Sequence, residues 1–289
     1  MAYKGKRINP KKFDRSQIKI ILIILPLVIF MAMPIIFIVN HAFKPMEELF
    51  AFPPTFFVRN PTLENFTKLV KFSRASSIPL SRYIFNSLIV TVLAVGGSLV
   101  LTTMSAFALA KIKFKGRNLL TQINQIAIMF VGTAVLIPRY IVICRLGLID
   151  NILAHVLPLI AMPVALFLVK QFVEQVPDSL LEAAYMDGAT DFQVYLRVIL
   201  PMIKPAIATA AILVFQQVWT NMETSNYFMN DDGMKTLTFY MNTLASTNNT
   251  VAGQGVAAAA SLIMFVPNLV LFIVLQRSVM NTMANSGIK

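Results

Sequence analysis

Residues 177–205 read PDSLLEAAYMDGATDFQVYLRVILPMIKP and predict two short helices joined by a tight turn. The first helix has a start signal, because Ser179 and Glu182 have the spacing of a capping box, in which the two side chains satisfy free backbone amides. It has a stop signal in Gly188, which can adopt the left-handed backbone conformation that commonly ends a helix. We therefore expect a helix over about Ser179–Asp187.

The second helix is signalled by Thr190 and Gln193, which repeat the capping-box spacing. Pro201 and Pro205 follow and bracket the return of the chain into an apolar segment. The sequence thus predicts a helix–turn–helix hairpin over residues 177–205, called the hairpin below.

The surface chemistry of the hairpin favours docking into another protein. Its first helix carries apolar and aromatic side chains at helical spacing: Leu180, Leu181, Ala184 and Tyr185. Such a helix can lie in a groove of a partner protein. The alternative is a helix lying on lipid, which would be rich in Lys and Arg on its polar face. Here Glu182, Asp187 and Asp191 are opposed by Arg197 alone, and an acidic face is poorly suited to anionic lipid.

Apolar stretches of membrane-spanning length flank the hairpin on both sides. A membrane-spanning helix needs about 20 mostly apolar residues, and six stretches of the chain qualify. They are Ile20–Asn40, Ile84–Ala110, Leu119–Ile143, Ile152–Phe172, Ala206–Asn226 and Val256–Gln276. The sequence therefore predicts an all-α membrane protein with six transmembrane helices.

The composition of the whole chain supports this fold class. Hydrophobic residues make up 57% of the 289 residues, charged residues 13%, and the mean hydropathy is +0.70. A soluble globular domain carries about 25% charged residues, because its surface meets water. The composition excludes intrinsic disorder, a coiled coil, a disulfide scaffold and an ordinary soluble enzyme.

The distribution of Lys and Arg predicts the orientation, because cytoplasmic loops carry an excess of both. With the N-terminus in the cytoplasm, sixteen Lys/Arg and six Asp/Glu fall inside, against nine and seven outside. Topology then explains the net charge of +12 without a nucleic-acid partner. We expect a basic tail over residues 1–19 and a single transmembrane domain over 20–289. Residues 41–82 and 227–255 would be outer loops, and the hairpin and both termini would be cytoplasmic.

Several kinds of active site are absent from the sequence. The single cysteine, Cys144, excludes an internal disulfide and a cysteine metal cluster. The two histidines, His41 and His155, cannot form a zinc site without other ligands. No G-x-x-x-x-G-K-[ST] phosphate loop, nucleophile elbow or H-E-x-x-H pair occurs. We therefore expect no catalytic residue, metal or cofactor in the chain itself.

The hairpin also carries a recognisable motif. Glu182-Ala183-Ala184, three further residues, Gly188, and then Ile199-Leu200-Pro201 resemble the EAA motif of the permeases of binding-protein-dependent ABC importers. Other segments follow the order that the carbohydrate branch of these permeases shows: Phe43-Lys44-Pro45, Pro53-Pro54, Pro61 to Phe66, Asn86-Ser87-Leu88, Ala106 to Ala110 and Gln276-Arg277. The chain is thus similar to the MalG-like carbohydrate permeases over nearly all of its length beyond the first twenty residues.

The resemblance implies a type I ABC importer permease fold in a bacterial cytoplasmic membrane, and import of a carbohydrate such as an oligosaccharide by alternating access. It implies three partners: a second, MalF-like permease, ABC ATPase subunits that bind ATP and Mg, and an extracytoplasmic sugar-binding protein. The first hairpin helix would be the coupling helix, inserted into a groove of one ATPase. The residues implied in coupling are Ser179, Glu182, Ala183, Ala184, Asp187, Gly188 and Pro201.

Polar and aromatic residues of the fifth apolar stretch are candidates for the substrate pathway, because polar groups in lipid are costly unless they face a pathway or a partner. A sugar needs hydrogen bonds from amides and carboxylates, and a flat ring for stacking. The stretch offers Gln216, Gln217, Trp219, Asn221 and Glu223. The alternative is that these side chains join the chain to the second permease. Arg139, near the end of the third stretch, is interpreted as a snorkelling or interfacial residue, with a contact to the substrate as the alternative.

Other functions stay open at this stage. A secondary transporter or channel usually carries ionisable residues in mid-span, whereas Arg139, Lys170 and Glu223 lie near the ends of stretches. Uptake driven by an ion gradient without ATP would favour that class. A membrane-embedded enzyme or assembly factor would need no ATPase partner. Within the ABC permeases, transport of a non-sugar solute is the remaining alternative.

Overall fold

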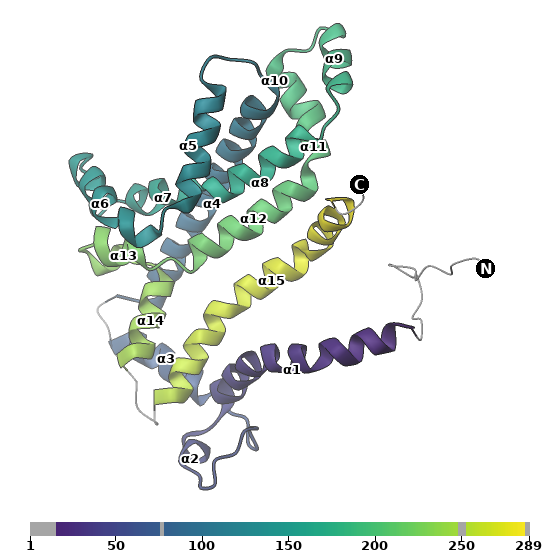
Figure 1. Cartoon of the computed structure of the whole chain (residues 1–289). Coiled ribbons are helices and arrows are strands. Elements are labelled where there is room, and N and C mark those ends of the chain that lie inside the picture. The colour runs from purple at the N-terminus through teal and green to yellow at the C-terminus, as the bar shows by residue number, and fades with distance from the viewer. Residues whose placement is uncertain (1–15, 76–77, 248–252, 287–289) are drawn as a thin grey trace. The chain divides into compact units, whose positions relative to one another are not determined.

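The computed structural model describes residues 16–75, 78–247 and 253–286, and within these ranges the chain is helical, without β-strands (Figure 1). The long helices are α1 (Ser16–Phe43), α4 (Leu80–Lys111), α12 (Lys204–Trp219) and α15 (Gln254–Ser286). Helices of intermediate length are α3 (Glu64–Ala75), α5 (Arg117–Met129), α6 (Leu136–Arg145), α7 (Ile152–Ile160), α8 (Pro163–Glu174), α9 (Asp178–Met186) and α14 (Leu237–Thr247). The short elements are α2 (Met46–Leu49), α10 (Asp191–Val194), α11 (Leu200–Met202), α13 (Glu223–Phe228), the 3-10 turns η1 (Gly132–Val135) and η3 (Asp232–Met234), and the π-helical turn η2 (Tyr195–Ile199).

The chain divides into two compact units. The smaller unit contains residues 1–69 and 245–262, and the larger unit contains residues 70–244 and 263–289. Helices α3, α14 and α15 therefore contribute to both units, whereas α1 belongs to the smaller one. Apart from residues 16–19, the predicted basic tail lies outside the described residues.

In the smaller unit, two polar side chains organise the segment that follows α1. The side-chain amide of Asn65 donates to the backbone carbonyls of Ala42 (3.1 Å) and Lys44 (2.9 Å), where α1 ends. The carboxylate of Glu48 accepts the backbone N–H of Arg59 at 3.0 Å, and this bond is the main cause of the lowered pKa of Glu48. The segment after α1 is thus folded back on itself by its own polar groups.

The core of the larger unit is built around α4, which packs against α7, α8 and α12 (Figure 1). Small residues occupy these contacts, since the core includes alanines without exposed surface: Ala94, Ala106, Ala165, Ala206 and Ala210. Small side chains let helix backbones approach closely, which is how helices associate in lipid, where no hydrophobic effect drives them together. Valines such as Val169 and Val214 fill the remaining space.

Several helices have the length and apolar character of membrane-spanning segments. Three qualify alone, namely Ile18–Phe43, Leu80–Lys111 and Gln254–Gln276. Three bent pairs qualify when each pair is taken as one span: Arg117–Met129 with Gly132–Arg145, Ile152–Ile160 with Pro163–Glu174, and Asp191–Met202 with Lys204–Trp219. The prediction of an all-α chain with several candidate membrane helices is confirmed for the described residues.

The third predicted span is not a continuous helix. Helix α5 and the segment formed by η1 and α6 meet at an angle of 111°. Between them Phe130 and Val131 have extended backbone conformations, with ψ of 131° and 134°. Gly132 follows, and glycine is a poor helix former because it loses much conformational freedom on ordering. The prediction of one helix over Leu119–Ile143 is therefore wrong.

The fourth and fifth predicted spans also need correction. Helices α7 and α8 are separated by a bend of 44°. Met162 lies between them in an extended conformation (φ −114°, ψ 97°), because the ring of Pro163 disfavours a helical conformation in the residue before it. In the fifth stretch α12 ends at Trp219, so Asn221 and Glu223 lie beyond the helix.

Candidate functional site

The first helix of the hairpin, α9, begins one residue earlier than predicted. Asp178 is its first residue and Pro177 its N-cap, without a side-chain hydrogen bond from the cap. The predicted capping box of Ser179 and Glu182 is therefore wrong, and Ser179 lies inside the first turn. Asp178 supplies a negative charge near the N-terminus of α9 instead, where the helix dipole favours one.

The turn between the two hairpin helices has the predicted form. Gly188 follows the end of α9 with a φ of +82°, in the left-handed region that glycine adopts readily. A Cβ atom at this position would meet no atom within 4 Å, so glycine is required by the backbone conformation and not by its neighbours. The capping box of Thr190 and Gln193 is confirmed, since each side chain accepts the backbone N–H of the other, at 3.4 and 2.9 Å.

Two tyrosine hydroxyls hold the hairpin together and attach it to α4. The hydroxyl of Tyr185 donates to Asp191 Oδ1 at 2.8 Å and so joins the first hairpin helix to the second. Burial, and next the bond to this carboxylate, raise the pKa of Tyr185. Further on, the hydroxyl of Tyr195 forms a buried hydrogen bond of 2.8 Å with the hydroxyl of Thr103 in α4. The π-helical turn η2, where the chain returns from the hairpin, is thus fixed to the core of the larger unit.

The outer face of α9 is uncovered. Leu181 is buried, and Ala184 packs against the core beside it. Glu182, Tyr185 and Met186 are exposed, the last with a relative exposure of 88%. Among the described residues no hydrogen bond or ion pair involves the Glu182 carboxylate, and Figure 1 shows α9 at one end of the larger unit. This end therefore presents an exposed surface of apolar, aromatic and acidic side chains.

The opposite end of α4 is held to residues 229–238 by buried polar contacts. The side-chain amide of Asn86 donates to the carbonyls of Gly233 (2.8 Å) and Lys235 (2.9 Å), and Ser87 Oγ accepts the first backbone N–H of α14 at 2.7 Å. Helix α4 has 32 residues, which at 1.5 Å per residue makes it about 48 Å long. The hairpin and residues 229–238 therefore lie at opposite ends of a helix long enough to cross a bilayer.

Two side chains from other elements fix the same segment. His155 of α7 has no exposed surface; its Nε2 donates to the Met234 carbonyl at 3.0 Å, and its Nδ1 lies 2.7 Å from the Thr224 hydroxyl. Because the Met234 carbonyl can only accept, Nε2 of His155 carries a proton. Asp150 accepts the backbone N–H of Asp231 at 3.0 Å, and this bond is the main cause of the lowered pKa of Asp150. The segment is thus ordered from several directions.

The five residues predicted for the substrate pathway do not form one cluster. Trp219 is buried, and its indole N–H donates to the Met264 carbonyl of α15 at 3.0 Å. Asn221 Oδ1 accepts the backbone N–H of Thr224 at 3.1 Å and lies 2.8 Å from its hydroxyl. The polar groups of Trp219 and Asn221 therefore form hydrogen bonds to other residues of this chain.

The other three pathway candidates have different surroundings. Glu223 forms an ion pair of 2.5 Å with Arg139, so the arginine predicted to be interfacial has a partner. Gln216 and Gln217 are exposed on α12. Gln216 lines a groove of about 280 Å³ between α12 and α15, together with Asn268. The other lining residues of this groove are apolar: Ile212, Phe265, Leu269, Leu271 and Phe272.

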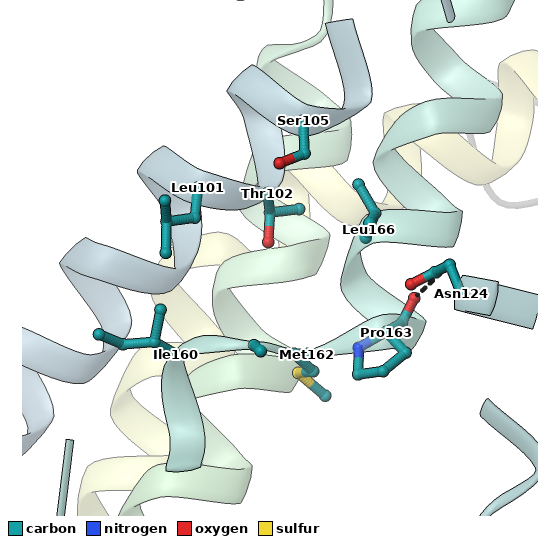
Figure 2. Close-up of a pocket in the computed structure, with 9 residues that line it drawn as sticks. Leu101, Thr102, Ser105, Asn124, Ile160, Met162, Pro163 and Leu166 are labelled. Atoms are coloured by element: carbon teal, nitrogen blue, oxygen red, sulfur yellow. Dashed lines mark hydrogen bonds between the residues drawn. The ribbon is translucent and has the colours of Figure 1, made fainter. Parts of the chain in front are cut away.

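A separate cavity of about 230 Å³ lies between α4, α5 and the break between α7 and α8 (Figure 2). Its polar groups are the hydroxyls of Thr102 and Ser105 and the amide of Asn124, which donates to the Pro163 carbonyl at 3.2 Å. The five predicted pathway residues are not among those that line it. Within the described ranges, no three His, Cys, Asp or Glu side chains are placed to hold a metal ion.

A model of one protein family matches almost the whole chain. The match runs over residues 18–279, and the family is described as "Binding-protein-dependent transport system inner membrane component". The chain belongs to this family. It is thus a membrane component of a transport system that works with a binding protein, and the resemblance carried by the EAA motif is confirmed.

Individual proteins resemble this transport component over most of its length. The inner membrane ABC transporter permease protein YcjP of Escherichia coli is 26% identical over 258 residues, which cover 89% of this chain and 90% of the relative. The diacetylchitobiose uptake system permease protein DasC of Streptomyces coelicolor is 28% identical, over 89% of this chain and 91% of the relative. A chain from the crystal structure of "a bacterial ABC transporter involved in the import of the acidic polysaccharide alginate" matches with a TM-score of 0.77 at 22% identity, over 93% of this chain and 99% of that chain. The fold is therefore that of an ABC importer permease.

The described residues whose buried polar contacts have no role predicted from the sequence include Asn86, Ser87, Thr103 and His155. A polar side chain within an apolar stretch is the signal that could have found them, because such a group needs a partner in lipid. That signal does not name the partner. The bonded groups in other elements lie between 69 and 150 positions away along the chain.

Proposed function

We propose that this chain is one of two permease subunits of an ATP-driven importer for a carbohydrate, and that α9 is the coupling helix through which an ATPase moves it. The placement of the EAA motif carries the proposal. Glu182 and Gly188 lie on an exposed hairpin at one end of α4, while the other end of α4 is joined to residues 229–238 by buried bonds.

Six crossings of the membrane fit the candidate spans. Three single helices and three bent pairs each have the required length and apolar character. Counted from a cytoplasmic N-terminus, six crossings place the hairpin and both termini in the cytoplasm and residues 229–238 outside. The excess of Lys and Arg on the side of the hairpin supports this orientation. The chain would then lie in the bacterial cytoplasmic membrane as a multi-pass protein.

The energy for transport would come from a partner ATPase, because the sequence has no phosphate loop. The exposed Tyr185 and Met186 offer apolar surface to a groove in that partner, and Glu182 and Asp187 offer charge. Closure of two ATPases on ATP and Mg would move α9 and turn the spans from an inward-facing to an outward-facing arrangement. Hydrolysis would reset them.

A second permease would pack against spans that the chain itself leaves uncovered. Almost all side chains of Ile18–Phe43 are exposed, and little of Gln254–Gln276 is buried within the chain. Such apolar surfaces need lipid or another subunit. A MalF-like partner against them would enclose a pathway that one subunit cannot form alone.

The substrate class rests on the relatives and on one groove. DasC is named for diacetylchitobiose uptake, and the matching crystal structure is of an alginate importer. In this chain the amides of Gln216 and Asn268 lie in the groove with the rings of Phe265 and Phe272. Amides can bond sugar hydroxyls, and rings can stack on sugar faces. Gln217, Trp219, Asn221 and Glu223 stay candidates for contacts with the sugar or with the second permease.

Co-purification tests the proposal. The tagged full chain is extracted from its native membrane in mild detergent, and its partners are identified by mass spectrometry. We expect an ATPase with a phosphate loop, a second permease with its own EAA motif, and a binding protein that can then be screened against saccharides and amino acids. Recovery of the chain alone, from membranes shown to contain such an ATPase, would contradict the proposal and favour a secondary transporter.

A further inference from the structure

One ammonium group lies where three helices meet at the base of the hairpin. Lys111 is the last residue of α4, and its Nζ donates to the Val176 carbonyl at 2.6 Å, to Asp178 Oδ1 at 2.7 Å and, more weakly, to the Glu174 carbonyl at 3.5 Å. Only 8% of the Lys111 side chain is exposed. An ammonium has three donors, so each of them has an acceptor here.

The acceptors of Lys111 come from the end of one helix and the start of another. Glu174 is the last residue of α8 and Val176 lies two residues beyond it, where free carbonyls carry the negative end of the helix dipole. Asp178 is the first residue of α9. A single charge therefore connects α4, α8 and α9. Bonds to charged groups are about twice as strong as bonds between neutral groups.

A simpler reading is that Lys111 extends toward water from the end of a span, as Lys residues near membrane surfaces do. The surroundings of Lys111 argue against that reading. Lys113 and Lys115 in the same loop are exposed, whereas the Lys111 side chain is turned onto backbone carbonyls. Its burial and its two strong bonds mark it as a structural connection between elements.

The hairpin is attached to α4 at a second point. Tyr195 follows α10 and bonds Thr103, two helical turns before Lys111. Lys111 holds the chain before α9, and Thr103 holds it after α10. The hairpin is thus fixed to one helix on both of its sides, and Asn86 joins the far end of that helix to residues 229–238.

We propose that Lys111 is a positioning residue that makes α9 move as one body with α4 and α8, so that a displacement of the coupling helix reaches the opposite end of α4. This inference rests on the proposed function of α9. Without Lys111, an ATPase could still hold α9, but α9 could shift against α4 before the membrane helices respond. Loss of Lys111 should therefore weaken the link between ATP use and transport and leave ATPase binding intact.

The test uses the full complex with its co-purified partners in proteoliposomes. Nitroxide labels are placed at Met186→Cys on α9 and Leu101→Cys on α4, both exposed positions, in a Cys144→Ser background. Pulsed EPR measures the distance between them without nucleotide and with MgATP and vanadate. We expect one narrow distribution in both states for the native Lys111, and a broadened, nucleotide-dependent one for Lys111→Met.

The matched variants separate charge from position. Lys111→Arg keeps the cation and should restore the narrow distribution, and Lys115→Met removes an exposed cation of the same loop and should change nothing. Stimulation of ATP hydrolysis by the co-purified binding protein should fall about tenfold in Lys111→Met, the factor that corresponds to the loss of one charge-assisted bond. The amount of bound ATPase should stay the same.

Two results would overturn the inference while the proposed function stands: an unchanged distance distribution in Lys111→Met, or full stimulation of its ATPase. If the complex does not assemble with Lys111→Met, the same measurements are made on Asp178→Asn. This variant removes the exposed charged acceptor and leaves Lys111 its bonds to the two carbonyls. We expect the same change in a weaker form, and native behaviour would overturn the inference. Absence of any ATPase from the native complex would instead contradict the proposed function.

Discussion

At the Lys111 end of α4 a buried ammonium bonds an exposed hairpin, whereas at the Asn86 end a buried amide bonds half-buried backbone carbonyls. Lys111 bonds a carboxylate, Asp178, that is 76% exposed. Asn86 is 1% exposed, and its amide bonds two backbone carbonyls. The first arrangement leaves a surface free for the proposed ATPase. The second fixes residues 229–238 to the other end of the same helix. A displacement can pass along α4 from one end to the other only if both ends are bonded to their neighbours.

The largest effect is expected at the buried end. Asn86→Leu removes the donor to the carbonyls of Gly233 and Lys235 and leaves both without that bond, so the free energy of unfolding should fall by about 3 kcal/mol. Thermal unfolding in detergent measures the loss. Asn118→Leu, at an exposed position of α5, is the matched control and should stay within about 0.5 kcal/mol. Equal losses in the two variants would mean that the buried bonds contribute little.

A smaller effect on stability, but a clear one on coupling, is expected at the turn of the hairpin. Gly188→Val places a β-branched residue at a φ of +82°, which costs about 1–2 kcal/mol. The turn should reshape, and the number of substrate molecules taken up per ATP hydrolysed should drop. Gly188→Asn is the control, because asparagine tolerates this conformation. Transport that stays coupled in the valine variant would contradict the role given to α9.

Tyr195→Phe should lower the free energy of unfolding by about 1 kcal/mol, because the buried Thr103 hydroxyl loses its hydrogen bond to Tyr195. Thr103→Val should lose a similar amount. The double variant should lose no more than either single one, since both remove the same interaction. Additive losses in unfolding experiments would show that the two hydroxyls act independently.

The smallest effect concerns pH at the exposed end. The bond and the charge of Lys111 hold the pKa of Asp178 below its ordinary value of 3.8. A lowered pKa in the folded state means that the pair stabilises the fold above pH 3.8 and loses that contribution as the pH falls through the folded pKa. The label distance between α9 and α4 should therefore be constant at neutral pH and broaden only below pH 3.8. Broadening near pH 6 would indicate that another group holds the hairpin.

The local signals of the sequence predict the hairpin well and the long-range contacts poorly. Gly188 and the pair Thr190–Gln193 act within a few residues, and the structure has them as predicted. The prediction that Ser179 caps the first hairpin helix is wrong, because the helix begins at Asp178 after Pro177, and the serine therefore lies in the first turn.

The spans show the same limit. Hydropathy predicts the apolar stretches but not the break between α7 and α8, where Pro163 keeps Met162 out of the helical conformation. The preference of residues before proline for extended conformations could have predicted that break. The partners of Lys111 and Asn86 lie 67 and 147 positions away, and they are brought close only by the packing of α4 against other helices. Periodicity and capping rules carry no information over such distances.

Cross-linking from the two ends of the larger unit tests the central claim most directly. In a Cys144→Ser background, a photoactivatable group is attached to Met186→Cys on α9 or to Tyr227→Cys on α13, both exposed, and the native complex is irradiated. We predict that Met186→Cys captures the ATPase and that Tyr227→Cys captures the binding protein and never the ATPase. Capture of the ATPase from Tyr227→Cys, or of no ATPase from Met186→Cys in a complex that contains one, would contradict the assignment of α9 as the coupling helix.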